Sequence, residues 1–314
     1  MAVAEDAVGA GSMPANTPSL PVLSVAAGKG GTGKTLIATS LVLALNERHP
    51  GGVRILDCDV EEPNAHLLLR PEIASTETVS VLVPCVNKVR CDACGKCAEV
   101  CQYSAIAVIR DAVLTFPELC SGCGACVYIC PRRAIDEEAR EVGVVSSGRT
   151  PEGIEFHGGT VHVGVQRSGP VTRAVKRRIS ADMITIVDAP PGTACPMQET
   201  VESSDFCILV TEPTPFGLSD LGAVVETCKA LNVPCGVIVN RDGPTDPGIE
   251  DYCLQQQIPL LLRIPQSREI AEAYSSGHTL TAALPEWKEA FLNTYDEIVR
   301  LTNTLSGGEE YARV

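Results

Sequence analysis

The chain has 314 residues, of which 45% are hydrophobic, and its formal net charge at pH 7 is -14. This length allows about two domains with a sizeable hydrophobic core, whereas the acidic balance argues against a nucleic-acid partner, because phosphate binding depends on Lys and Arg. No run approaches the roughly 18 apolar residues of a membrane span, and the amino terminus lacks the basic start and apolar core of a signal peptide. We therefore expect a cytoplasmic protein with no stable membrane anchor.

The amino-terminal residues 1–20 are rich in Ala, Gly, Ser and Pro, which predicts a disordered tail. A buried strand is predicted at residues 21–27, a helix with apolar periodicity at 35–48, and a second strand at 53–59. Strand, helix and strand in this order predict a parallel pair joined by a right-handed crossover.

After Cys130 the alternation of helices and strands returns. It predicts helices at residues 170–179, 219–231 and 248–256, and strands at 183–190, 206–213, 234–240 and 259–265. The predicted fold is therefore α/β, a doubly wound and mostly parallel sheet with helices on both faces, built from residues 21–83 and 143–314.

Residues 84–142 interrupt this pattern as a predicted inserted domain, and cysteines dominate them. Eight of the 15 cysteines fall there in two runs of the pattern C-x2-C-x2-C-x3-C, namely Cys91, Cys94, Cys97 and Cys101, then Cys120, Cys123, Cys126 and Cys130. A reducing cytosol disfavours disulfides, and so small a domain needs bound metal to hold it together. The spacing is typical of 4Fe-4S ligands, whereas structural zinc normally uses two ligand pairs separated by a longer span.

The inserted segment resembles a bacterial two-cluster ferredoxin, in which the fourth cysteine of each run binds the other cluster. The resemblance implies one 4Fe-4S cluster on Cys91, Cys94, Cys97 and Cys130, and another on Cys101, Cys120, Cys123 and Cys126. Gln102 stands where this pattern has a proline, whereas Pro131 keeps it. Because that proline is not a ligand, we expect the first run to be more exposed and still to bind its cluster.

A phosphate-binding loop, GKGGTGKT, joins the first predicted strand to the first helix. Its glycines let successive backbone N–H groups point at phosphate oxygens, while Lys34 neutralises phosphate charge and the Thr35 hydroxyl binds Mg²⁺. ATP and Mg²⁺ are the expected cofactors. The loop residues predicted to bind them are Gly28, Lys29, Gly30, Gly31, Thr32, Gly33, Lys34 and Thr35.

The second lysine of this loop, Lys29, resembles the signature of the MinD, ParA, Mrp and nitrogenase iron protein superfamily of P-loop ATPases. The resemblance implies an ATP-dependent homodimer in which Lys29 reaches the nucleotide of the other subunit. It implies that Asp59 positions the attacking water and that Asp188, in the stretch DAPPGT, lies near Mg²⁺. Catalytic roles are implied for Lys29, Lys34, Asp59 and Asp188, and contacts to adenine for Asn240, Arg241 and Pro265.

The combination of both parts resembles a subgroup of MinD-superfamily ATPases with an inserted two-cluster ferredoxin domain, found with metal-cluster systems such as the orange protein complex. We therefore expect an ATPase that couples dimerisation to electron transfer or metal-cluster assembly on a redox or metal-cluster client protein. The alternative is a positioning or partitioning ATPase whose clusters are structural or sense redox state. A Mrp-like iron-sulfur carrier is disfavoured, because the C-terminal half lacks a C-x-x-C pair.

Two cysteines outside the runs are candidates for further ligands. Cys195 follows Asp188 by seven residues, a spacing at which the nitrogenase iron protein holds a cluster between subunits. The preceding segment offers no second cysteine for such a site, which favours a packed or interface cysteine. Cys85, just outside the first run, is a weaker candidate.

Overall fold

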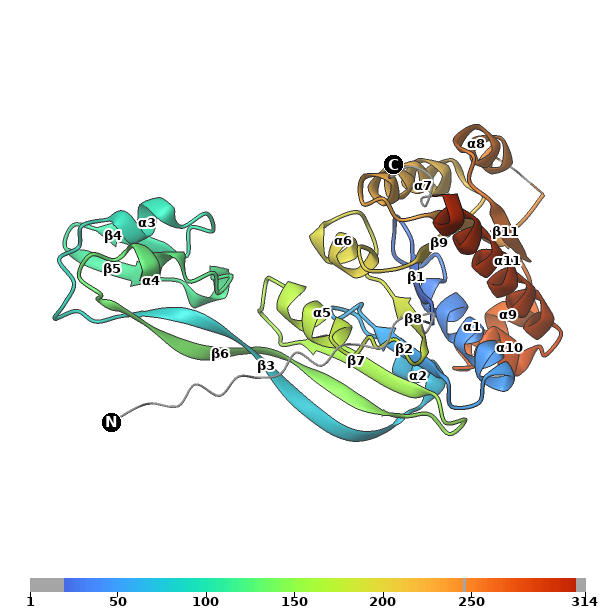
Figure 1. Ribbon diagram of the computed structural model, residues 1–314, viewed down its shortest axis with the longest axis horizontal. Coiled ribbons are helices and arrows are strands. Elements are labelled where there is room, and N and C mark those ends of the chain that lie inside the picture. Colours follow the sequence, from blue (N-terminus) through green and yellow to red (C-terminus); the bar gives the residue numbers. More distant parts are fainter. Residues whose placement is uncertain (1–19, 245–246, 309–314) are drawn as a thin grey trace.

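A nine-stranded sheet in the order β11-β10-β9-β1-β8-β2-β7-β6-β3 forms the centre of the computed structural model (Figure 1), which describes residues 20–244 and 247–308. From β11 to β7, each strand is parallel to the next one in this order. The last two pairs, β7 with β6 and β6 with β3, are antiparallel. This confirms the mostly parallel sheet. The predicted tail lies outside the described residues except for Leu20. The strands are β1 (Val22–Ala26), β2 (Val53–Asp57), β3 (Glu72–Val86), β6 (Ile135–Arg149), β7 (Glu155–Val161), β8 (Ile184–Asp188), β9 (Phe206–Thr211), β10 (Cys235–Asp242) and β11 (Leu260–Pro265).

Helices cover both faces of the sheet, as the doubly wound prediction requires. All residues of β1, β2, β8 and β9 are buried, as expected of parallel strands covered on both sides. Leu23 and Val25 of β1 pack with one set of helices, and Ala26 packs with the other. None of the described helices is long and apolar enough to cross a membrane. The first face carries α1 (Lys34–Arg48), α2 (Ala65–Leu69), α9 (Arg268–Ser275), α10 (Leu280–Ala283) and α11 (Trp287–Gly308), and the second α5 (Gly169–Lys176), α6 (Cys195–Val201), α7 (Pro215–Ala230) and α8 (Ile249–Gln256).

Strands β3 and β6 form a long antiparallel ribbon that leaves the sheet (Figure 1). Residues 143–149 of β6 pair with both β3 and β7, whereas residues 135–141 pair with β3 alone. Most of β3 is exposed, so its sequence lacks the apolar run that marks a buried strand. The predicted domain boundaries at residues 84 and 142 consequently fall inside the two ribbon strands.

The far end of the ribbon carries a small cysteine-rich unit, residues 87–134, which we call the cysteine module (Figure 1). It contains α3 (Lys96–Val100), β4 (Ile106–Ile109), β5 (Ala112–Thr115), a short 3-10 helix η1 (Pro117–Leu119) and α4 (Ala125–Ile129). Its buried hydrophobic cluster comprises Cys97, Ile106 and the ribbon residue Ile135. So small a core contributes little hydrophobic stabilisation. A bound metal group would supply the stability that the module's own core lacks.

Candidate functional site

The phosphate-binding loop runs from the carboxyl end of β1 to the amino end of α1, where Lys34 is the first helical residue. Gly33 has the left-handed backbone angle φ 96°, and a Cβ at this position would lie 2.4 Å from Asn240 Nδ2. The Asn240 amide donates a hydrogen bond of 2.8 Å to the Thr32 carbonyl oxygen. Glycine is therefore required at residue 33, and Asn240, predicted as an adenine contact, braces the loop in this structure.

Three predicted residues, Lys34, Asp59 and Asp188, meet at the carboxyl edge of the sheet. Lys34 is buried, and its Nζ lies 4.0 Å from Asp59 Oδ2. Asp188 ends β8 and is fully buried, and among the described residues neither of its carboxylate oxygens has a hydrogen-bond partner of normal geometry. Burial raises the pKa of Asp188 to about 6. The Lys34 ammonium and the nearby Thr35 hydroxyl lower this pKa, but by less than burial raises it. Mg²⁺ prefers oxygen ligands, and a buried carboxylate without a hydrogen-bond partner beside a hydroxyl offers them. Asp188 and Thr35 therefore suit a bound Mg²⁺.

Asp57 is a site residue to which the sequence analysis gave no role. It pairs in register with Asp188 on the neighbouring strand. Its carboxylate accepts hydrogen bonds from the Asp59 N–H at 3.2 Å and the Ala65 N–H at 3.0 Å. Burial and the Asp188 carboxylate raise the pKa of Asp57 well above its ordinary value. Asp57 thus holds the loop that carries Asp59, and its position at the end of a buried strand was the available signal.

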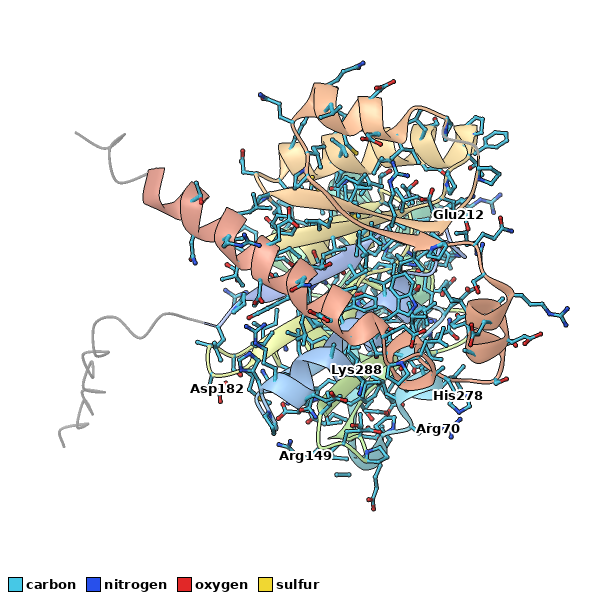
Figure 2. The ribbon with its side chains drawn as sticks, turned by 90° about the vertical axis from the view of Figure 1, so that its right-hand side faces the viewer. Arg70, Arg149, Asp182, Glu212, His278 and Lys288 are labelled. Atoms are coloured by element: carbon cyan, nitrogen blue, oxygen red, sulfur yellow. The ribbon has the colours of Figure 1, made fainter. Side chains whose placement is uncertain are left out.

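Glu212 is the second residue without a predicted role (Figure 2). It directly follows β9 and is nearly buried, and its Oε2 lies 3.1 Å from Lys29 Nζ. The same carboxylate forms an ion pair with Arg241, whose φ of 56° is left-handed. Lys29 and Arg241 therefore share one carboxylate. Pro265, the third predicted adenine contact, is exposed at the end of β11, in register with Asp242 of β10.

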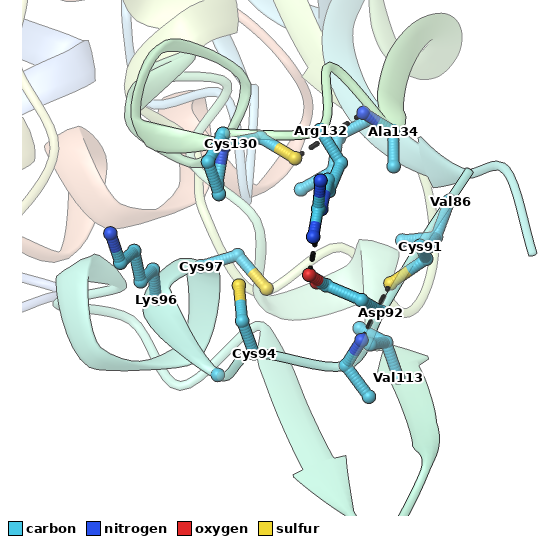
Figure 3. Close-up of a pocket in the computed structure, with 14 residues that line it drawn as sticks. Val86, Cys91, Asp92, Cys94, Lys96, Cys97, Val113, Cys130, Arg132 and Ala134 are labelled. Atoms are coloured by element: carbon cyan, nitrogen blue, oxygen red, sulfur yellow. Dashed lines mark hydrogen bonds and ion pairs between the residues drawn. The ribbon is translucent and has the colours of Figure 1, made fainter.

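The first cysteine pocket of the module is lined by Cys91, Cys94, Cys97 and Cys130 (Figure 3). Three cysteines come from the first run, and the fourth comes from the second run. Val86, Val113 and Ile135 give the pocket apolar walls, and an ion pair of 2.8 Å joins Arg132 and Asp92 at the same pocket. Pro131 also lines this pocket.

The second cysteine pocket is lined by Cys101, Cys120, Cys123 and Cys126, again three from one run and the fourth from the other. Leu82, Pro84 and Ile106 form apolar walls, and Tyr103 also lines it. Each set of four is the set that the ferredoxin resemblance implied for one cluster. Cys85 and Cys195 are exposed, and neither is among the residues lining the two pockets.

Backbone N–H groups point at one pair of cysteine sulfurs in each run. The pattern repeats between the runs: Ala93 donates to Cys91 at 3.4 Å, Gly122 to Cys120 at 3.4 Å, Ala105 to Cys101 at 3.3 Å and Ala134 to Cys130 at 3.3 Å. Hydrogen bonds to sulfur of this kind are among the features that set the potential of an iron–sulfur cluster. Within the described residues no group of His, Cys, Asp or Glu is arranged to hold a single metal ion. All-sulfur ligands spread around an apolar pocket suit the separate iron corners of a cubane better than one ion.

Comparison with known proteins agrees with this geometry. The sequence pattern of the CobQ/CobB/MinD/ParA nucleotide binding domain matches residues 23–280. An uncharacterized protein of Methanocaldococcus jannaschii is 32% identical over 226 residues, which cover 70% of this chain and 78% of that protein. The cytosolic Fe-S cluster assembly factor Nubp1 homolog of Drosophila ananassae is 25% identical over 186 residues, 47% of this chain and 59% of that protein.

Among solved structures, the septum site-determining protein MinD of Pyrococcus horikoshii, complexed with Mg-ADP, is similar in fold. It superimposes with a TM-score of 0.56 at 22% sequence identity, covering 90% of this chain and 97% of that chain. This likeness concerns the fold, whereas the sequence match to the family spans residues 23–280, a range that includes the phosphate-binding loop, Asp59 and Asp188. The chain belongs to the CobQ/CobB/MinD/ParA family of nucleotide-binding proteins.

Proposed function

We propose that the protein is an ATPase that couples ATP-dependent dimerisation to electron transfer, or to metal-cluster assembly, on a partner protein. Two 4Fe-4S clusters in the cysteine module are the redox or cluster-handling part of this proposal. The observation that carries it is the presence of two pockets, each lined by four cysteines, in a chain that also has a complete phosphate-binding loop. The name of the Drosophila relatives supports the cluster-assembly form.

At the nucleotide site the proposal assigns each role to a residue of this chain. Lys34 and the loop N–H groups hold the phosphates, Thr35 and Asp188 hold Mg²⁺, and Asp59 orients the attacking water. Lys29 leaves Glu212 and contacts the nucleotide of the other subunit when the dimer closes. A bound Mg²⁺ supplies positive charge that stabilises the transferred phosphoryl group.

In the module, Cys91, Cys94, Cys97 and Cys130 hold one cluster, and the residues lining the second pocket hold the other. A 4Fe-4S cluster supplies one-electron chemistry at a potential set by hydrogen bonds to sulfur and by solvent exposure. The four N–H donors to sulfur and the apolar walls are the features of this chain that set those conditions. The alternative is a positioning or partitioning ATPase whose clusters are structural or sense redox state.

The test is anaerobic purification followed by iron and sulfide analysis and electron paramagnetic resonance of the reduced protein. We expect about eight irons per chain. Cys94→Ser should lower the iron content by about half, since it removes a ligand from one pocket. Cys85→Ser is the matched control and should keep the full content, because Cys85 lines neither pocket. Stoichiometric zinc without iron after anaerobic expression would refute the cluster assignment, and a chain that does not hydrolyse ATP would refute the enzymatic part.

A further inference from the structure

The cysteine module contacts the ATPase core away from the ribbon, through Tyr103 and Arg167. The Arg167 guanidinium carbon lies 4.0 Å from the centre of the Tyr103 ring, a cation–π contact. Tyr103 lines the second cysteine pocket, and Arg167 lies on the exposed loop 162–168 between β7 and α5. Figure 1 shows this loop facing the module. One side chain of the core therefore reaches the wall of a cysteine pocket.

The loop that carries Arg167 is attached to the nucleotide site through backbone hydrogen bonds. Val60 directly follows Asp59, and its carbonyl oxygen accepts a hydrogen bond of 2.9 Å from the Val161 N–H. The next residue, His162, donates to the Val142 carbonyl oxygen of the ribbon, also at 2.9 Å. These two hydrogen bonds connect Val60, the neighbour of Asp59, to the start of the Arg167 loop and to the base of the ribbon.

The base of the ribbon contains a β-bulge at the same place. The pairing of β3 with β6 shifts between Val79 and Ser80, where Val79 pairs with Gly143 and Ser80 with Glu141, so that Val142 is the extra residue. Gly143 is also the first β6 residue that pairs with β7. A bulge bends a strand and weakens its ladder locally. The ribbon is therefore bent and more weakly paired at the point where it leaves the sheet, and it can flex there.

We infer that Arg167 is a docking residue that holds the cysteine module against the ATPase core through Tyr103, and that nucleotide binding releases it. Movement of Asp59 and Val60 on nucleotide binding shifts the Arg167 loop, the cation–π contact opens, and the ribbon pivots at the bulge. Release uncovers the face of the Tyr103 ring that Arg167 covers, so that a partner can contact this wall of the second cysteine pocket. This inference rests on the proposed function, because it specifies how the nucleotide site regulates the clusters.

The test is hydrogen–deuterium exchange on the anaerobically purified full-length protein with its clusters. Arg167→Gln and Tyr103→Leu should each speed amide exchange about two- to five-fold in the segments 102–106 and 162–168, the range that an exposed cation–π contact supplies. Tyr103→Phe keeps the aromatic face and should behave as wild type. Arg110→Gln is the matched control, since it removes the same charge from the exposed turn between β4 and β5.

A second comparison measures wild type with no nucleotide, with ADP and with a slowly hydrolysed ATP analogue. The analogue should speed exchange in both segments of the wild type and add nothing in Arg167→Gln. Unchanged exchange in Arg167→Gln and Tyr103→Leu, or a wild type that does not respond to nucleotide, overturns the inference. Iron content and ATP hydrolysis of the same samples show separately whether the proposed function has failed, because both are independent of where the module lies.

Discussion

Lys29 and Lys34 belong to one loop but lie in different electrostatic surroundings. Lys34 is 5% exposed and faces Asp59, whereas Lys29 is 38% exposed in its side chain and pairs with Glu212. Under the proposed function, the buried Lys34 binds the nucleotide of its own subunit. A more exposed cation on one ion pair is free to exchange partners at low cost, because such pairs contribute little stability.

This difference predicts distinct effects for the two lysines. Lys34→Gln should weaken ATP binding about 30-fold or more, the loss expected when a buried charged contact is removed. Lys29→Gln should change ATP affinity about five-fold or less, and should abolish ATP-dependent dimerisation and most hydrolysis. Calorimetric titration and sedimentation with ATP measure both. A Lys29→Gln protein that dimerises and hydrolyses ATP as wild type does contradicts the role of Lys29 across the dimer.

The Asp188 carboxylate predicts a pH dependence of the nucleotide-free protein. Its folded pKa of about 6 lies above the ordinary value of 3.8, so the folded state binds this proton more tightly than the unfolded state. Its stabilising contribution is therefore fully present below the unfolded pKa and is lost as the pH rises through about 6.

Between pH 4 and 7, wild type should consequently lose stability relative to Asp188→Asn, by about 2 kcal/mol. Denaturant unfolding at each pH measures this difference, and the variant corrects for the other titrating groups, Asp57 and Asp59 included. Parallel pH profiles for the two proteins would show that Asp188 is not the group responsible. Added Mg²⁺ and ATP should remove the difference at pH 7.5, because they neutralise the wild-type carboxylate.

Among the elements, the base of the ribbon depends on Gly143. A Cβ at this position would lie 2.4 Å from the Thr160 carbonyl oxygen and 2.7 Å from Val171 Cγ2. Gly143→Ala should therefore destabilise the protein by about 1–3 kcal/mol. Gly222→Ala in α7 is the control, since its Cβ would have 3.7 Å to the nearest atom and alanine favours the helix. Thermal unfolding distinguishes the two, and equal midpoints would mean that the junction adapts to a methyl group.

Strands whose sequence is a continuous apolar run were predictable, whereas strands without such a run were not. Strands β1, β8 and β9 are buried on both faces, so their composition reveals them. Strand β3 is largely exposed and β6 is exposed over most of residues 136–141, and their mixed polar residues carry no such pattern. The ribbon is held by a long ladder of backbone hydrogen bonds, which the side-chain sequence does not encode.

The same distinction applies to the site residues. The loop of Lys34 and the cysteine runs have fixed spacing along the chain, so local patterns predicted both. Glu212, Arg167 and Tyr103 act through contacts between distant segments, and no local pattern reports those contacts. Asn240 was recognised as a site residue, but its hydrogen bond to Thr32 appears only in the folded chain.

At the scale of the whole molecule, the phosphate-binding loop and the two cysteine pockets lie in separate parts of one chain. The nucleotide site lies at the carboxyl edge of the parallel strands, and the cysteine module lies at the end of the ribbon (Figure 1). Nucleotide can change the behaviour of the clusters only if the module makes different contacts in different nucleotide states. The Val60 to Val161 hydrogen bond, the bulge and the Arg167 contact lie between the two sites, and the inferred release of the module acts through them.

The most direct test of the coupling is an anaerobic redox titration of the clusters with no nucleotide, with ADP and with a slowly hydrolysed ATP analogue. If the ATPase controls the clusters, the analogue should shift at least one midpoint potential. A shift of about 60 mV corresponds to a change of about 1.4 kcal/mol in the free energy of the reduced form relative to the oxidised form. The reduction rate by a small dye should change in the same state. Identical potentials and identical rates in all three states would contradict the account, and would leave an ATPase that carries its clusters without controlling them.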